Sequence, residues 1–127
     1  MMVKKIINTK KAPAAIGTYS QAIMIDKFLY LSGQIPLDPI TSDVVSGDIT
    51  QQINQVFKNL NAICNEAGGN LQNIIKLNIF LTDLKNFALI NEIMAQYFVE
   101  PYPARAAVGV CQLPKNVAVE MDAVAYF

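Results

Sequence analysis

The sequence predicts a single α+β domain over residues 1–127, with two helices packed on one face of a mixed β-sheet. Two segments carry apolar residues at helical spacing, and shorter segments around them show the alternating or continuous apolar pattern of strands. In chain order the elements read strand, hairpin, helix, strand, helix, hairpin, an order typical of helices gathered on one side of a sheet. The length of 127 residues fits one domain.

The composition favours an oligomer and argues against a nucleic-acid-binding protein. Hydrophobic residues make up 53% of the chain and charged residues only 16%, which is more apolar than a small domain needs. We therefore expect the uncovered face of the sheet to be buried against a second copy of the protein. Ten basic residues balance ten acidic ones, and no basic block of the kind that binds nucleic acid is present.

The chain has no histidine, so it lacks the commonest general base and the commonest metal ligand. Cys64 and Cys111 are its two cysteines, too few for a structural zinc site or a disulfide framework. Neither a secretory signal nor a membrane-spanning stretch is recognisable in the sequence. We expect a cytoplasmic protein without a bound metal.

The first third of the chain predicts three strands and a loop that carries a tyrosine. Residues 3–7 read as a short strand, and residues 22–25 and 28–31 flank a two-residue polar break as in a hairpin. The Pro- and Gly-containing segment before the hairpin is expected to lay Tyr19 against the domain, as a packing residue or as part of a site. Gly33 marks a bulge, a close backbone approach or an ordinary strand end.

The first helix is the most strongly patterned element. Asp48 or Thr50 can cap its start, and the glycine pair at residues 68–69 supplies its end. Its apolar stripe places Cys64 in the core rather than at a reactive site. The other members of that stripe are Ile49, Ile53, Val56, Phe57, Leu60, Ile63 and Ala67.

A strand and a second helix follow. Within residues 71–81, Ile75, Leu77, Ile79 and Leu81 alternate with less apolar positions, which predicts a half-buried strand. Residues 86–98 read as a helix, with Phe87, Ile90, Met94 and Tyr97 on one stripe. Asn91 lies beside this stripe, near the rim of the helix.

The last third predicts a hairpin between residues 106–111 and residues 117–126. This pairing sets Glu120 opposite Gly109, on the same face as Ala107 and Arg105. Arg105 then lies about 13 Å farther along the strand, too far for a direct salt bridge but with room for a ligand between the two charges. A carboxylate on a strand face is often merely solvated, and this alternative stays open for Glu120.

Arg105 follows a proline that restricts the chain. Pro103 fixes its own φ and favours an extended Tyr102, so we expect Arg105 at the rigid start of a strand. The planar guanidinium suits a carboxylate or a phosphate. The alternative is a surface arginine that closes a salt bridge.

The available groups suit the addition of water to a small carboxylate-bearing substrate. Arg105 can hold the anion, and Glu120 can hold or polarise water. No nucleophile has a recognisable neighbouring base, and no glycine-rich phosphate loop is present. Further hydrogen-bonding side chains and accessible backbone groups are expected at Tyr19, Ser32, Gly33 and Ala107.

Together these stretches resemble the RidA/YjgF family of reactive intermediate deaminases. The likeness covers nearly the whole chain, in order and with matching spacing. The stretches that carry it are APAAIG at residues 12–17 with Tyr19, SGQIP at 32–36, EAGG at 66–69, FALIN at 87–91, PAR at 103–105, and LPK at 113–115 leading to Glu120.

The resemblance implies a chorismate mutase-like fold and a homotrimer with its sites in clefts between subunits. It also implies hydrolysis of 2-imino acids, or of enamine tautomers such as 2-aminoacrylate, to 2-keto acids and ammonia. No cofactor is implied. In this family the arginine after Pro-Ala separates members with imine deaminase activity from many that lack it.

The family roles transfer residue by residue. Arg105 would hold the substrate carboxylate, and Glu120 would position the attacking water. Tyr19, Ser32 and Asn91 would line the pocket, with Tyr19 counted among the catalytic groups. The carbonyl of Gly33 and the amide of Ala107 would contact the reacting end. Several active members carry cysteine where this chain has Ala107, but the backbone amide is kept either way.

Two other functions stay open at this point. The family is also described as containing endoribonucleases that inhibit translation, but balanced charge, the lack of histidine and the lack of an aromatic stacking platform argue against RNA cleavage. A non-catalytic, chaperone-like trimer that binds small carboxylates is the third reading, and the presence of Arg105 and Glu120 weighs against it.

Overall fold

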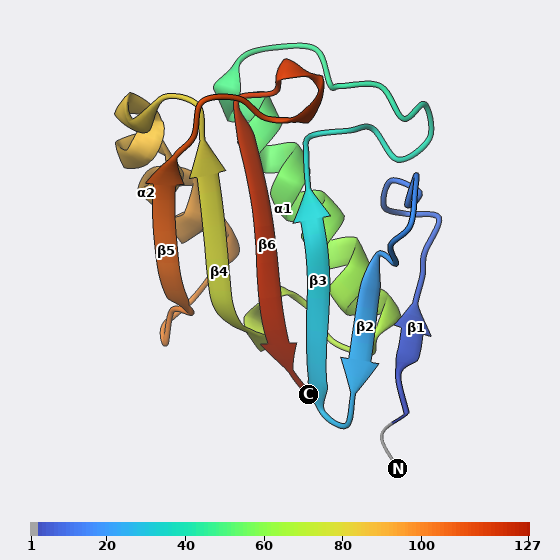
Figure 1. The fold of residues 1–127 in the computed structure, drawn as a ribbon. Helices are drawn as coiled ribbons and strands as arrows, with labels where there is room; N and C mark the ends of the chain where they lie inside the picture. The colour runs from blue at the N-terminus through green and yellow to red at the C-terminus, as the bar shows by residue number, and fades with distance from the viewer. Residues whose placement is uncertain (1–2) are drawn as a thin grey trace.

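In the computed structural model, which describes residues 3–127, six strands form one sheet in the order β1-β2-β3-β6-β4-β5 (Figure 1). Neighbouring strands are antiparallel except for β4 and β5, which run parallel. The mixed sheet expected from the sequence is confirmed. The strands are β1 (Lys5–Ile7), β2 (Ala22–Ile25), β3 (Phe28–Gln34), β4 (Ile74–Leu81), β5 (Ala104–Gly109) and β6 (Val119–Tyr126).

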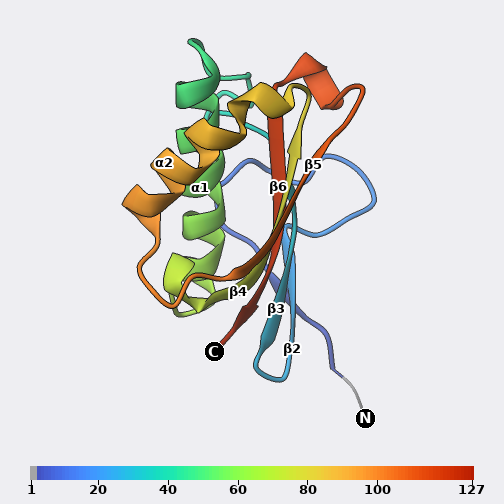
Figure 2. The same cartoon turned by 90° about the vertical axis from the view of Figure 1, so that its left-hand side faces the viewer.

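Two α-helices lie on the same face of this sheet, as Figure 2 shows. They are α1 (Ile49–Glu66) and α2 (Phe87–Tyr97), close to their expected ranges. Asp48 caps α1 by accepting from the backbone N–H groups of Thr50 and Gln51, and the Gln51 side chain accepts from the N–H of Asp48 in return. In the described part of the chain, neither helix is long and apolar enough to cross a membrane.

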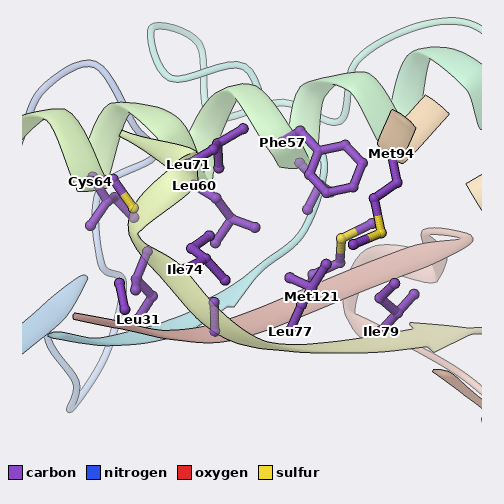
Figure 3. Packing of buried hydrophobic residues seen from close by; sticks show 14 of the residues in the cluster. Leu31, Phe57, Leu60, Cys64, Leu71, Ile74, Leu77, Ile79, Met94 and Met121 are labelled. Carbon is purple, nitrogen blue, oxygen red and sulfur yellow. The ribbon is translucent and has the colours of Figure 1, made fainter. Parts of the chain in front are cut away.

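The core fills the space between the helices and the sheet. Phe57 and Leu60 point from α1 toward Leu77 and Ile79 of β4 (Figure 3), and all four side chains are fully buried or nearly so. The expected apolar stripe of α1 is therefore confirmed. Cys64 belongs to it, and burial raises the pKa of its thiol to about 12, which keeps it protonated and unreactive.

The predicted hairpin between the last two strands is wrong. β6 lies between β3 and β4, whereas β5 pairs with β4 and forms an edge of the sheet. The side chains explain the order. The helix-facing residues of β6 are almost completely buried, as in a central strand, whereas most residues of β5 remain exposed.

This order separates Arg105 from Glu120. Arg105 pairs with the buried Leu77, so its side chain lies on the helix-covered face. Glu120 pairs with Phe80 and lies between two buried neighbours along β6, so it points to the opposite, open face. The expectation that Glu120 shares a face with Arg105, Ala107 and Gly109 is therefore wrong, because it rested on the hairpin.

A bulge also changes the start of β4. The register with β6 shifts between Ile74 and Lys76, so Ile74 is buried and Ile75 is 46% exposed. The expected alternation holds from Leu77 onward. In α1, the amide of Asn59 is buried and donates to the carbonyls of Ile35 and Leu37, just after the end of β3.

The open face of the sheet is largely apolar over β1, β2 and β3, whereas Asn78, Glu120 and Asp122 make it polar between β4 and β6. One row across four strands consists of Ile6, Ile23, Tyr30 and Val124, which are register partners. Ile6 is 65% exposed and Tyr30 is 52% exposed. Phe28 and Tyr126 stack edge to face beside this row, with their ring centroids 5.1 Å apart. An antiparallel sheet face of this composition is typical of a surface that is buried in an assembly.

Replacing Phe57 by alanine tests the core. Phe57 is fully buried and packs on the rings of Tyr97 and Phe98. We expect Phe57→Ala to lower the free energy of unfolding by about 3–5 kcal/mol, because a cavity replaces the ring. Urea unfolding at fixed protein concentration measures the change, and Lys58→Ala, at an exposed position of the same helix, is the control. A loss no larger than that of the control would contradict this packing.

Candidate active site

Arg105 is held against α2 by uncharged partners. Its guanidinium donates to Oδ1 of Asn91 and lies 3.8 Å from the sulfur of Met94. The carbon at the centre of the guanidinium is 4.9 Å from the ring centroid of Phe87. Phe87, Asn91 and Met94 follow one another at helical spacing, so one face of α2 supports the side chain. Its charge remains available to an anion.

The Arg105 side chain lines a cavity of about 480 Å³ between α2 and the start of β5. We call it the Arg105 cavity. Tyr102 and Pro103 form one wall, so the proline-restricted approach predicted from the sequence contributes directly to the site. The lining residues are Asn91, Met94, Ala95, Tyr102, Pro103 and Arg105.

A second cavity, of about 280 Å³, lies beside the end of β3 and is called the Tyr19 cavity. Its walls come from the loop before β2, from the end of β3 and from the turn before β6. The lining residues include Pro13, Tyr19, Gly33, Ile35, Leu37 and Lys115. The hydroxyl of Tyr19 accepts a hydrogen bond from the N–H of Ile16 at 3.2 Å. Tyr19 is 52% exposed, so it forms part of a surface rather than of the core.

The buried side chain of Gln21 fixes the loop that carries Tyr19. Its Nε2 donates to the carbonyls of Thr9, Ala12 and Pro13, and its Oε1 accepts from the N–H of Thr9 at 2.7 Å. Ser32 adds a second link, because its hydroxyl donates to the carbonyl of Ser20 at 2.6 Å. Ser32 therefore braces the loop beside Tyr19.

Gly33 and Glu120 meet on the open face of the sheet. The register between β3 and β6 shifts between Leu31 and Gln34, so a bulge contains Gly33. A Cβ atom at this position would lie 2.5 Å from Oε2 of Glu120. Of the readings left open for Gly33, the structure favours the bulge with a close approach, and the partner is a carboxylate.

Burial raises the pKa of the Glu120 carboxyl above its ordinary value of 4.5, and the nearby charge of Asp122 adds to this effect. Asp122 is itself held by Asn78, whose side-chain amide donates to Oδ1 at 2.7 Å. A carboxylate with a raised pKa is a stronger base, which suits a group that holds and polarises water.

Ala107 exposes its backbone amide at the edge of the sheet. β5 pairs with β4 alone within the described residues, and the N–H of Val110 donates to the carbonyl of Leu81 at 2.8 Å. Since successive N–H groups along a strand point to alternate sides, the N–H of Ala107 points away from β4. This donor is thus available to a ligand or to a second chain.

Within one chain, the predicted site residues form two clusters. Arg105 joins Asn91 on the helix side, and Glu120 joins Gly33 near Tyr19 on the other side. The Arg105 cavity and the Tyr19 cavity share no lining residue. The sequence did not reveal Lys115 as a lining residue, because no local pattern connects it to Tyr19. The spacing of Phe87 and Asn91 was visible in the sequence, but not their contact with Arg105.

The chain is similar to known proteins in both sequence and fold. A family model described as Endoribonuclease L-PSP matches residues 9–127. The chain belongs to this family, that of the RidA/YjgF proteins. It is 49% identical to a RutC family protein of Pyrococcus abyssi, over 98% of each chain.

Two further relatives are informative about activity and fold. A human protein named 2-iminobutanoate/2-iminopropanoate deaminase is 43% identical, over 98% of this chain and 90% of its own. The crystal structure of RidA from the Antarctic bacterium Psychrobacter superposes with a TM-score of 0.93 at 48% identity, over 97% of this chain and 99% of that one. The names in the family thus include both a deaminase and an endoribonuclease.

The raised pKa of Glu120 predicts how the stability of the protein changes with pH. Because its pKa is raised in the folded protein, the folded state holds this proton more tightly than the unfolded chain does. Stability from this group is therefore present at low pH and is lost as pH rises from the ordinary pKa through the raised one. As pH rises through this window, we expect the urea concentration at the midpoint of unfolding to fall less for Glu120→Gln than for the wild type. Equal slopes for the two proteins would contradict the shift.

Proposed function

We propose that this protein hydrolyses reactive 2-imino acids, such as 2-iminobutyrate, and enamine tautomers such as 2-aminoacrylate, to 2-keto acids and ammonia. The observation that carries this proposal is the guanidinium of Arg105, which is positioned by uncharged partners and faces a cavity. Relatives named 2-iminobutanoate/2-iminopropanoate deaminase support it. The removal of such electrophiles would protect other cell components from damage.

The proposed chemistry is the addition of water to a carbon that is already electrophilic. Arg105 holds the substrate carboxylate through two parallel hydrogen bonds, which sets the orientation of the C=N bond. Glu120 holds a water molecule and accepts one of its protons as the oxygen attacks C2. Glu120 gives this proton to the substrate nitrogen, which yields a carbinolamine. The carbinolamine loses ammonia when the C–N bond breaks, the hydroxyl proton passes to the leaving nitrogen and the C=O bond forms. One water is consumed for each ammonia released, and no cofactor is required.

The remaining residues have supporting roles in this proposal. Asn91 orients the guanidinium through its Oδ1, so it acts on the substrate through Arg105. Tyr19 and the carbonyl of Gly33 face the reacting end, and Ser32 braces the Tyr19 loop. The edge amide of Ala107 donates to the reacting end of the substrate.

The proposal requires an assembly, since Arg105 and Glu120 lie on opposite faces of one chain. We propose a homotrimer in which the Arg105 cluster of one subunit meets the Tyr19 and Glu120 cluster of the next. The apolar open face supports this, because exposed rows such as Ile6, Ile23 and Tyr30 are rarely left in water. The free edge of β5 would then contribute its amides at the interface.

The description of the family model keeps RNA cleavage as a second candidate. Equal numbers of basic and acidic residues speak against a phosphate-binding surface. RNA cleavage that persists in an Arg105 variant and falls with salt would favour this candidate. Binding of a keto acid without any turnover would instead favour a non-catalytic trimer that binds small carboxylates.

Substitution of Arg105 tests whether this residue holds the substrate carboxylate. A coupled assay generates the imine with threonine dehydratase or an amino-acid oxidase and follows how fast the imine disappears. We expect Arg105→Ala to lower kcat/KM at least about 100-fold, because two charge-assisted hydrogen bonds are lost. Arg105→Lys should fail largely as well, since a point charge does not reproduce the planar fork. Retained activity in a folded Arg105→Ala protein would refute the proposal, and Lys58→Ala serves as the control.

Two glycine substitutions separate activity from stability. In Gly33→Ala, the new Cβ would overlap Oε2 of Glu120, and the flexible carboxylate would turn away. We expect a large loss of kcat and a small loss of stability. Gly68→Ala is the opposite case, because nothing lies within 4 Å of its Cβ but the backbone has φ +104. That change should lower Tm while kcat stays normal. The reverse pattern would argue against a role for Glu120.

A further inference from the structure

We propose that Lys115 forms a second cationic subsite in the Tyr19 cavity, which favours 2-imino acids whose side chain ends in a second carboxylate. The inference deepens the proposed function and rests on it. Lys115 lines the same cavity as Tyr19 and Gly33, the residues assigned to the reacting end of the substrate. Any ligand that contacts those two residues therefore lies beside the turn that carries Lys115.

Lys115 carries the charge among the described residues that line this cavity, and the carboxylate of Glu120 lies beside Gly33 without lining it. Every other lining residue is uncharged, including Pro13, Ile35 and Leu37. The ammonium donates to the backbone carbonyl of Ser42 at 3.4 Å, which is a long contact to a neutral acceptor at an exposed position. Such a contact is weak and easily exchanged for one with an anion, whose charge strengthens the hydrogen bond.

The turn that presents Lys115 is fixed at both ends. Lys115 (φ 55) and Asn116 (φ 56) both have left-handed backbone conformations, which side chains with a Cβ rarely adopt. Leu113 and Val117 on either side are buried, and the N–H of Asn116 donates to the carbonyl of Leu113 at 3.1 Å. The backbone is therefore held in place, and the side chain lines the cavity from a fixed turn.

Arg105 and Lys115 line different cavities of one chain. In the proposed assembly, each site would therefore take its Arg105 from one subunit and its Lys115 from the next. Arg105 would bind the carboxylate next to the imine carbon, and Lys115 would remain for the far end of the substrate. A monocarboxylate would use the first cation alone, whereas a dicarboxylate would use both. Lysine suits this task because its point charge accepts a carboxylate in many orientations.

The experiment uses two substrates that differ by one carboxylate. An amino-acid oxidase converts glutamate to 2-iminoglutarate and norvaline to 2-iminopentanoate, which have equally long carbon chains. For the wild type we expect a higher kcat/KM with 2-iminoglutarate. Lys115→Gln should lower that value about tenfold, the scale of one charge-assisted hydrogen bond, and should leave 2-iminopentanoate unchanged. Lys115→Glu should lower it further, and added salt should weaken the wild-type preference.

Controls keep the test specific. Lys58→Gln removes a lysine charge from an exposed position of α1 and should leave kcat/KM unchanged for both substrates. Equal effects of Lys115→Gln on both substrates, or none on either, would overturn the subsite. A changed oligomeric state of Lys115→Gln by analytical ultracentrifugation would overturn it too, because Lys115 would then serve the interface.

Binding separates this inference from the proposed function. Titration calorimetry compares 2-oxoglutarate with 2-oxopentanoate on the same proteins. If neither imine is hydrolysed but 2-oxoglutarate binds more tightly and only while Lys115 is present, the deaminase proposal fails and the subsite stands. If both imines are hydrolysed but Lys115 does not increase the affinity for 2-oxoglutarate, the deaminase proposal stands and the subsite is refuted.

Discussion

The position of β6 between β3 and β4 determines where the charged groups of the candidate site lie. This last strand of the chain is paired along both of its edges, and its register sends Met121 into the core and Glu120 to the open face. A slip by one residue would exchange these two side chains between the faces. Burial of Met121 and its helix-facing neighbours therefore fixes the carboxylate on the open face, next to Gly33.

Separation of the two charges has a physical consequence. If Arg105 and Glu120 lay side by side in one chain, they would form an ion pair, and a substrate carboxylate would have to displace it. On opposite faces, Arg105 is oriented by Asn91 and Phe87 instead, and Glu120 keeps a raised pKa. Each group is thus positioned by its own chain while its charge remains unneutralised.

The sequence predicted the helices, the strands and the members of both clusters better than it predicted how the clusters are arranged. Helical and strand periodicities show which face of an element is buried, and the cap at Asp48 marks where α1 starts. Periodicity does not reveal which strands are neighbours, so the assumption that β5 pairs with β6 was wrong and carried Glu120 to the wrong face. The bulge at Ile75 and the cavity wall at Lys115 arise from long-range contacts that no local pattern encodes.

Both clusters are organised before any second chain is present. Four hydrogen bonds of the Gln21 side chain hold the loop beside Tyr19, and one face of α2 supports Arg105. Assembly would then only have to bring two rigid surfaces together, so little conformational entropy would be lost at the site itself. In the proposed assembly, the apolar row of Ile6, Ile23, Tyr30 and Val124 would supply attraction between subunits, whereas Glu120 lies elsewhere on the same face, beside Gly33. If the proposed assembly forms, an apolar row for association and two positioned clusters would let a chain without histidine or a nucleophile–base pair form a hydrolytic centre.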